Sequence, residues 1–387
     1  MIAPDQNELG QKLAPHSDAR APLRARLLAP ADLTATELAA WSRLAERAVE
    51  PNPFFTPEFV RAALDAGHTD AVLLVVGDDD GWRACVPLRR RIHGRGLMLP
   101  CFAAWLPEYA YLGVPLVDFD AIEPATRALV DFAAAQRRTA ALFLGPLPSD
   151  GPVAIALRAA SARRGAQPVV VEAWERAALH RRPEPTYLDD VRPKRRKELR
   201  RLRRALEREL GGTAQVVNRT GDPQACDEFL SLELDSWKGE QSTALASSAR
   251  DAGFFRAMCA GLAPAHGVEL LALEVDGRTA AMQCNLIAQD HMFGFKVAYD
   301  RSLARFSPGA LLEVDAIGVF HDSRSLTLAD SCAAPDNELM NRLWPDRRPL
   351  ELLALPTGGA LGSLVAPAVA AERSARRAVR AARRRLR

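Results

Sequence analysis

Two distant stretches of the chain repeat the same order of hydrophobic and turn residues. The first, from Asn52, is NPFFTPEFVRAALDAGHTDAVLLVVGDDDGWRACVPL, and the second, from Asp251, is DAGFFRAMCAGLAPAHGVELLALEVDGRTAAMQCNL. Each has a Phe-Phe pair, a helical pattern, an apolar strand, an Asp/Gly turn and a second strand, and a third strand follows near Leu97–Ala104 and at His291–Tyr299. Asp-Gly between strand-like runs indicates a β-hairpin. Helix–hairpin orders also arise by chance, but two copies in the same order favour duplication and predict two similar α+β domains.

The length of the chain, 387 residues, also favours two domains, because single cores rarely grow that large. A proline cluster, a basic run and a Gly-Gly stop separate the two mixed segments. We therefore predict a disordered tail over 1–22, a first domain over 23–175, a second domain over 176–352, and a linker with an Arg-rich tail over 353–387. Each domain is expected to have a mixed, mostly antiparallel sheet flanked by helices.

Composition argues against several classes of partner and location. A net charge of +3 implies no polyanion partner for the chain as a whole, and we expect no DNA partner. The cysteines form no C-x-x-C pair and the histidines show no metal-ligand spacing, so we expect free thiols and no metal. The N-terminus lacks the apolar core of a signal peptide, and no run approaches the roughly 20 apolar residues of a membrane span. We expect a cytoplasmic protein without a transmembrane segment.

The basic run from Lys194 to Leu210 has leucines at spacings of three and four, which predicts a helix with one apolar stripe. Its other face is rich in Arg and Lys, with interspersed glutamates. That face is either a solvated surface with intrahelical ion pairs or a contact for a phosphate-rich partner, such as a cofactor diphosphate, tRNA or an anionic lipid surface. No aromatic residues interleave the run, which argues against base stacking.

The segment FLSLELDSWKGEQSTAL begins as a helix and stops at Gly239. Glu233, Trp237 and Lys238 cluster near the C-terminal end of that helix. The helix dipole alone would favour a lysine there. The alternative is a polar cluster at the edge of a cleft, in which Trp237 and Lys238 bind substrate.

Four motifs carry a resemblance to a known family. RRKELRRLRRALE, FLSLELDSWKGEQSTAL, LLALEVDGRTAAMQCNLI and FKVAYDRSLARFSPGALLEVDAI resemble, in order and spacing, the GNAT-like domain of CelD-type cellulose-biosynthesis acetyltransferases over about residues 190–345. That family is similar to the FemAB peptidyltransferases, which carry two GNAT-like domains in tandem. The first half looks like a degenerate copy. The resemblance implies a cytoplasmic acyltransferase that moves an acyl group, acetyl as the first expectation, from acyl-CoA to an amine or hydroxyl of a small-molecule or polysaccharide-related acceptor.

The resemblance also implies where the donor binds. In GNAT enzymes a splayed strand and the start of the next helix hold the acyl carbonyl and the phosphates, and helix N-termini bind anions readily. Here Ser307 is a good N-cap, Pro308 suits the first helical position, and Gly309 would let a phosphate approach the backbone. Arg301 and Arg305 could add positive charge. The usual loop, Gln/Arg-x-x-Gly-x-Gly/Ala, is absent, and the turn could equally be only a well-made helix start.

Direct acyl transfer needs a group that takes the proton from the attacking amine or alcohol. The candidates are Asp330, Glu233 and Tyr299. Asp330 ends the strand-like run SLTLAD and could act as a base if burial raises its pKa, or could cap the following segment.

Lys296 is the remaining catalytic candidate, because a charged amine within an apolar strand is costly to bury unless it has a function or a partner. Its amine could stabilise an oxyanion or neutralise a bound carboxylate. Strand alternation predicts that Lys296 shares a face with Gly294 and Ala298, opposite Phe295 and Val297.

Two other functions remain open at this point. One is a FemAB-like transferase that uses aminoacyl-tRNA, with the basic helix as its RNA contact. The other is a catalytically inactive GNAT-like scaffold. The Arg-rich tail is expected to be solvated and partly helical, with at most a weak contact to anionic membrane.

Overall fold

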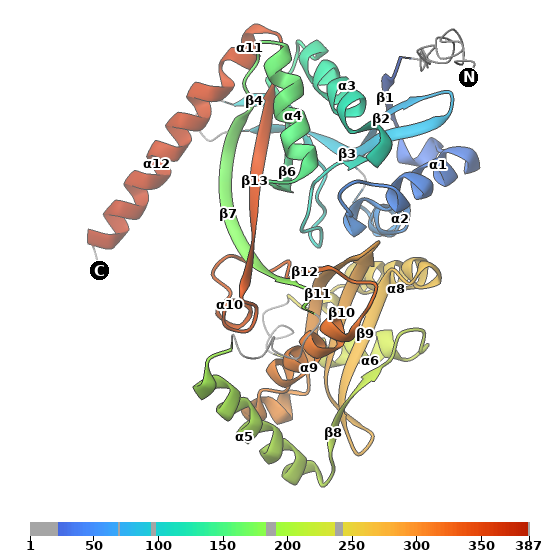
Figure 1. Cartoon of the computed structure of the whole chain (residues 1–387), viewed down its shortest axis with the longest axis vertical. Helices are drawn as coiled ribbons and strands as arrows, with labels where there is room; N and C mark the ends of the chain where they lie inside the picture. Colours follow the sequence, from blue (N-terminus) through green and yellow to red (C-terminus); the bar gives the residue numbers. More distant parts are fainter. Residues whose placement is uncertain (1–21, 69, 94–97, 183–190, 237–242, 386–387) are drawn as a thin grey trace, which may run out of the picture.

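The computed structural model of the chain describes residues 22–68, 70–93, 98–182, 191–236 and 243–385. Most of the first half of the chain forms one lobe, drawn in blue to green in Figure 1. Its main helices are α1 (Ala35–Glu46), α2 (Pro57–Asp65), α3 (Ile122–Ala135) and α4 (Pro152–Arg163). Its strands are β1 (Arg24–Leu28), β2 (Val72–Asp78), β3 (Gly81–His93), β4 (Leu99–Ala104), β5 (Leu116–Val117) and β6 (Ala141–Pro148).

The second lobe follows in the chain. Its helices are α5 (Pro193–Leu210), α6 (Ala225–Leu234), α8 (Ala249–Leu262), α9 (Pro308–Asp322) and α10 (Glu338–Leu343). Its strands are β8 (Ala214–Asn218), β9 (Val268–Val275), β10 (Arg278–Ala288), β11 (His291–Tyr299) and β12 (Leu328–Asp330). Two long strands, β7 (Val169–His180) and β13 (Asp346–Pro356), run between the lobes, and α11 (Ala360–Ser363) and α12 (Val365–Arg385) end the chain (Figure 1).

One sheet passes through both lobes. Its strand order is β1-β2-β3-β4-β6-β13-β7-β12-β11-β10-β9-β8, with β5 paired to β3. Only β4–β6 and β11–β12 pair in parallel, and the other neighbours are antiparallel. This confirms the predicted mixed, mostly antiparallel sheet flanked by helices. The boundary predicted at residue 175 lies within β7 and the linker predicted from residue 353 begins within β13; the division into domains stays a prediction.

The predicted repeat corresponds to two runs of elements in the same order. In the first lobe α2 leads to the β2–β3 hairpin and then β4, and in the second lobe α8 leads to the β9–β10 hairpin and then β11. The turn of the second hairpin is Asp276-Gly277, with φ of 50° and 75°, because Gly and Asp tolerate the left-handed backbone that a tight hairpin needs. Both expected third strands are present.

The two lobes share a hydrophobic core. The Phe-Phe pairs of the repeat lie at this contact: the Phe59 and Phe254 rings meet edge to face at 5.4 Å, and the Phe54 and Phe293 rings at 6.1 Å. Aromatic pairs of this kind add about 0.5–1.5 kcal/mol each beyond area burial. The lobes are therefore fixed to each other by a core as well as by the shared strands.

Candidate active site

β11 is paired with β12 for only part of its length. They pair in parallel where His291–Phe293 meets Leu328–Asp330. Beyond Phe293, β11 continues to Tyr299 while the chain after Asp330 turns away. A cavity of about 630 Å³ opens between them. Its floor is the unpaired edge of β11, one wall is the start of α9, and the other is the segment after β12.

Some of the predicted site residues lie at this cavity and others do not. Lys296, Tyr299, Ser307 and Gly309 line it. Glu233 and Asp330 lie behind its walls, fully buried. Arg301 and Arg305 are exposed and do not line it. The predicted substrate contacts Trp237 and Lys238 lie outside the described residues.

A β-bulge turns Lys296 to an unexpected face. Cys284 of β10 pairs with Lys296, but the next residue, Asn285, pairs with Gly294, so Phe295 is the extra residue of the bulge. Because neighbouring residues of β10 point to opposite faces, Lys296 and Gly294 lie on opposite faces of the sheet. The prediction that they share a face is therefore wrong, because simple alternation fails at a bulge.

The bulge directs Lys296 toward α6. Its Nζ lies 3.1 Å from Glu233 Oε1, and Glu233 Oε2 accepts a hydrogen bond of 2.8 Å from the Leu245 amide. Nζ also lies 4.8 Å from the centre of the Tyr109 ring. The lysine side chain is only 11% exposed, so its ammonium is held at the cavity wall by a carboxylate and an aromatic face.

The start of α9 forms the wall facing β11. Pro308 occupies the first turn as predicted, and Ser307 is the N-cap residue, but its side chain makes no capping hydrogen bond. Ser307 instead has the left-handed backbone, with φ of 53° and ψ of 51°. Among the described residues the Gly309 amide makes no hydrogen bond, so an unpaired N–H lies at the cavity. The predicted capping contact is therefore wrong, while the exposed helix start is present.

The two arginines predicted to bind phosphate precede this helix start but do not line the cavity. Arg305 pairs with Glu209 of α5 at 2.6 Å and stacks over the Phe306 ring at 4.6 Å. Arg301 is exposed at the start of the preceding 3-10 turn, Arg301–Phe306. Among the described residues, one arginine of the basic run does line the cavity: Arg195, in the first turn of α5. The role predicted for Arg301 and Arg305 stays a prediction.

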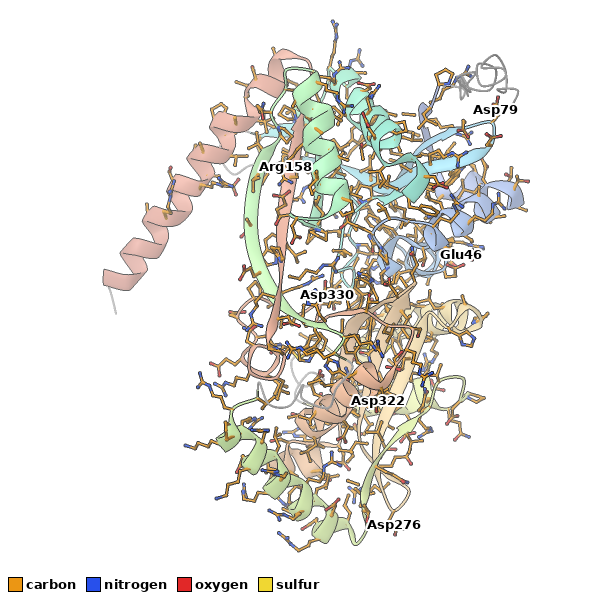
Figure 2. The ribbon with its side chains drawn as sticks, in the orientation of Figure 1. Glu46, Asp79, Arg158, Asp276, Asp322 and Asp330 are labelled. Carbon is orange, nitrogen blue, oxygen red and sulfur yellow. The ribbon has the colours of Figure 1, made fainter. Side chains whose placement is uncertain are left out.

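Asp330 lies where the two lobes meet, as Figure 2 shows. Its Oδ2 accepts hydrogen bonds of 2.6 Å from Arg176 of β7 and 2.7 Å from Arg348 of β13, and its Oδ1 accepts one of 3.0 Å from the Cys332 amide. Burial alone would raise its pKa, but the two guanidinium groups outweigh burial and hold the pKa at about 2. A role as a base requires a pKa raised by burial, and this expectation for Asp330 is therefore contradicted. The sequence did not show that two arginines surround this carboxylate.

Tyrosines from the first lobe complete the site. Tyr111 lines the cavity, and its carbonyl accepts a 2.8 Å hydrogen bond from Arg176. Tyr109 supplies the ring beside Lys296 and donates from its hydroxyl to Asp251 at 3.2 Å. Sequence analysis missed both residues. Their motif, PEYAYLG, begins at Pro107, shortly after β4, and its two tyrosines were the only signal of a role.

Glu313 was also missed. It lies in α9, is 2% exposed, lines the cavity, and accepts a 2.8 Å hydrogen bond from the Trp344 indole. Burial raises its pKa to about 7, and the bond from Trp344 lowers it only partly. Glu313 is the only acidic side chain among the described residues that line the cavity. A carboxylate inside the apolar run GALLEVDAI was the available signal.

The described residues contain no group of three or more His, Cys, Asp or Glu side chains arranged to hold a metal ion. Within the same residues, none of the helices combines the length and the hydropathy that spanning a membrane requires.

Comparison with known proteins agrees with this geometry. Residues 193–334 match the model of the family described as acetyltransferase (GNAT) domain. The matched segment lies within the second lobe. It contains the splayed strand, the bulge and the exposed helix start. No curated protein matches the sequence of the chain.

Solved structures resemble the whole two-lobed chain. A crystal structure of FemX has a TM-score of 0.55 at 12% identity, covering 88% of this chain and 100% of that one. The C-terminal domain of a putative lysylphosphatidylglycerol synthetase from Agrobacterium fabrum has a TM-score of 0.54 at 14% identity, with 88% and 96% covered. L-PGS from Bacillus licheniformis has a TM-score of 0.50 at 12% identity, with 84% and 92% covered. At these identities the likeness concerns the fold.

Proposed function

We propose that the chain transfers an acyl group from a CoA thioester to an amine or hydroxyl of a small-molecule or polysaccharide-related acceptor by direct attack. The observation that carries the proposal is the opening between β11 and β12, which joins a bulged strand edge to the unpaired Gly309 amide. A CelD-type relationship, an acetyl group and a cytoplasmic location belong to the same proposal and rest on the sequence motifs.

In this proposal the donor lies along β11. The free strand edge receives the arm of the thioester, and the start of α9 receives a phosphate, because the first amides of a helix are unpaired donors with a favourable dipole. Adding a Cβ at Gly309 would bring it to 3.4 Å from Val297 and 3.7 Å from Tyr299, which is ordinary contact distance. Alanine at this position would therefore fit the fold while narrowing the approach to the amide.

Lys296 and Glu313 have separate roles in the proposed chemistry. The Lys296 ammonium, oriented by Glu233 and Tyr109, stabilises the negative charge that develops on the thioester oxygen. The attacking amine or alcohol must lose a proton and the departing thiolate must gain one. Glu313, with a pKa of about 7, takes the first proton and returns it to the thiolate. Asp330 positions the arginines behind the site and takes no part in proton transfer.

The test compares two glycine variants. Gly309→Ala and Gly253→Ala both add a methyl group to a helix, and nothing lies within 4 Å of the added Cβ at Gly253 in α8. Both variants should gain a little helix stability. Only Gly309→Ala should weaken binding of CoA and acetyl-CoA, by about tenfold, measured by calorimetry. Failure of wild-type protein to bind any CoA ester would refute the CoA proposal.

Aminoacyl-tRNA is the second candidate donor, and the surface of α5 favours it. Arg195 of α5 lines the cavity, and exposed cations continue along the helix at Lys194, Lys197, Arg200 and Arg204. Some neighbouring arginines are paired, as Arg201 is with Glu198 at 2.8 Å. A rise in melting temperature with charged tRNA but not with CoA esters would select this donor, because only ligands of the native state stabilise it.

A further inference from the structure

One buried glutamine that lines the cavity has a side-chain oxygen without a hydrogen-bond partner among the described residues. Gln283 of β10 lines the cavity and is 2% exposed. Its Oε1 is closed off from solvent and has no hydrogen-bond partner among the described residues. An unsatisfied buried acceptor costs about 1–3 kcal/mol, so native structures rarely retain one without a reason.

A chain of side-chain hydrogen bonds fixes which atom of Gln283 is left over. Gln283 Nε2 donates to Asn285 Oδ1 at 3.0 Å, and Asn285 Nδ2 donates to Glu269 Oε2 at 3.0 Å. Burial raises the pKa of Glu269 and its bond with Asn285 lowers it. When Glu269 is ionised it only accepts hydrogen bonds, and Asn285 then presents its NH₂ group to Glu269 and its oxygen to Gln283. Gln283 must then use its own NH₂ group toward Asn285. The atom of Gln283 left without a partner is an acceptor.

The position of Gln283 assigns it to the donor side of the site. Its partner on β9 is Leu271, which belongs to the core beneath α9. Lys296 pairs with the adjacent residue Cys284 and points to the opposite face, toward α6. The helix start proposed to bind the donor's phosphate is that of α9. Gln283 therefore lies on the α9 side of the sheet, where the donor's phosphate is expected, and Lys296 lines the same cavity from the opposite face.

We propose that Gln283 selects a donor whose acyl group carries a hydroxyl or amino group that donates a hydrogen bond to Oε1. This inference rests on the CoA-dependent transfer proposed above, and it replaces the acetyl group expected from the sequence motifs with a substituted acyl group. An acetyl methyl has no donor for this oxygen and leaves its desolvation uncompensated, whereas an O–H or N–H satisfies it. The cavity of about 630 Å³ has room for a group longer than acetyl. Glu269 and Asn285 are positioning residues for Gln283.

The experiment measures binding of matched CoA esters by calorimetry. Propionyl-CoA is compared with lactoyl-CoA, 3-hydroxypropionyl-CoA and β-alanyl-CoA, which share its three-carbon chain and add one hydroxyl or amino group. Wild-type protein should bind at least one substituted ester about tenfold more tightly than propionyl-CoA. Gln283→Met should remove that preference while leaving propionyl-CoA affinity unchanged. Gln215→Met, at an exposed position of β8, is the control and should keep it.

Glu269→Gln tests the orientation without touching the cavity oxygen. A glutamine at 269 can donate to Asn285, which lets both amides reverse and present the NH₂ group of Gln283 to the cavity. The preference for substituted esters should fall about threefold or more, with no loss of propionyl-CoA binding. Equal binding of all four esters to wild-type protein would overturn the inference alone. Equal weakening of CoA and all esters in Gln283→Met would also overturn it, because Oε1 would then receive the CoA arm. Binding of none of the esters would overturn the proposed function as well.

Discussion

The two lobes begin alike and diverge at their third strand. In the first lobe β3 and β4 keep an unbroken register from Leu88–Ala104 to His93–Leu99. In the second lobe the β10–β11 register shifts at the bulge, and β11 parts from β12. The residues after β4 bring Tyr109 and Tyr111 to the site of the second lobe. One copy of the arrangement thus forms the cleft, and the other supplies part of its wall.

Each lobe also contains a carboxylate held by two arginines, and comparing them gives the largest expected effect. Asp330→Asn should destabilise the protein by about 3–5 kcal/mol, because it leaves Arg176 and Arg348 charged and buried. Asp118→Asn in the first lobe should cost about 1 kcal/mol, because its partners Arg47 and Arg83 reach solvent, with side chains 43% and 17% exposed. Urea denaturation of both variants measures the difference. Equal losses of unfolding free energy in the two variants would show that the Asp330 cluster between the lobes stabilises the protein no more than the Asp118 cluster.

A cation beside an aromatic ring also occurs in both lobes. Lys296→Met should lower kcat by about 100-fold or more with little change in KM, because one donor to the developing oxyanion is lost. Arg90→Met removes the first-lobe cation that lies 5.5 Å from the Phe102 ring and should leave activity unchanged. Release of free CoA from acetyl-CoA in the presence of an amine panel is the assay. An active Lys296→Met protein would refute the role given to this lysine.

Each lobe buries one glutamate whose pKa burial raises to about 7, Glu313 and Glu50. A carboxylate with a folded pKa above its unfolded value binds its proton more tightly in the native state. Its contribution to stability therefore falls as pH rises from about 4.5 to about 7. Glu313→Gln should remove this fall. The difference in unfolding free energy between the variant and wild type should therefore be more favourable to the variant at pH 8 than at pH 5, by on the order of a few kcal/mol.

Only the Glu313 variant should change the pH dependence of transfer. In wild-type protein the rate should rise through about pH 7 as Glu313 ionises, and Glu313→Gln should lose that rise. Glu50→Gln is the matched control, because Glu50 accepts a bond from the Val153 amide at the start of α4, far from the cavity residues in sequence. A rate profile that keeps its rise in Glu313→Gln would assign the proton to another group.

The smallest expected effect concerns α12, which has no counterpart among the described helices of the second lobe. Arg373 donates hydrogen bonds to the carbonyls of Val170 and Val171, on the part of β7 whose outer edge pairs with no strand of the described residues. Arg373→Ala should cost less than about 1 kcal/mol in urea denaturation, because the contact is exposed. It should also increase self-association in light scattering, because an uncovered strand edge is a pairing site. Unchanged association would mean that the edge needs no cover.

Local patterns in the sequence predicted much of the fold. The leucine spacing gave the helix from Lys194 to Leu210 to within one residue of α5, and the Asp-Gly turn gave the second hairpin, because both depend on neighbours in the chain. The bulge could not be predicted, because the side chains of GFKVAY fit a regular strand and only the pairing with β10 reveals the extra residue. The same holds for the site. Lys296 and Gly309 stood out locally, whereas the arginines around Asp330 and the tyrosines of the first lobe come from distant segments.

The placement of β13 has a consequence for synthesis of the chain on the ribosome. β13, residues 346–356, fills the gap between β6 and β7, which were made long before it. Until it emerges, those two strands each lack a neighbour, and the Arg348 contact to Asp330 cannot form. The first lobe therefore cannot close while it is being translated, although N-terminal domains commonly fold first. Its completion waits for the last strand, and nascent chains stalled before residue 346 should be far more sensitive to protease than the released protein.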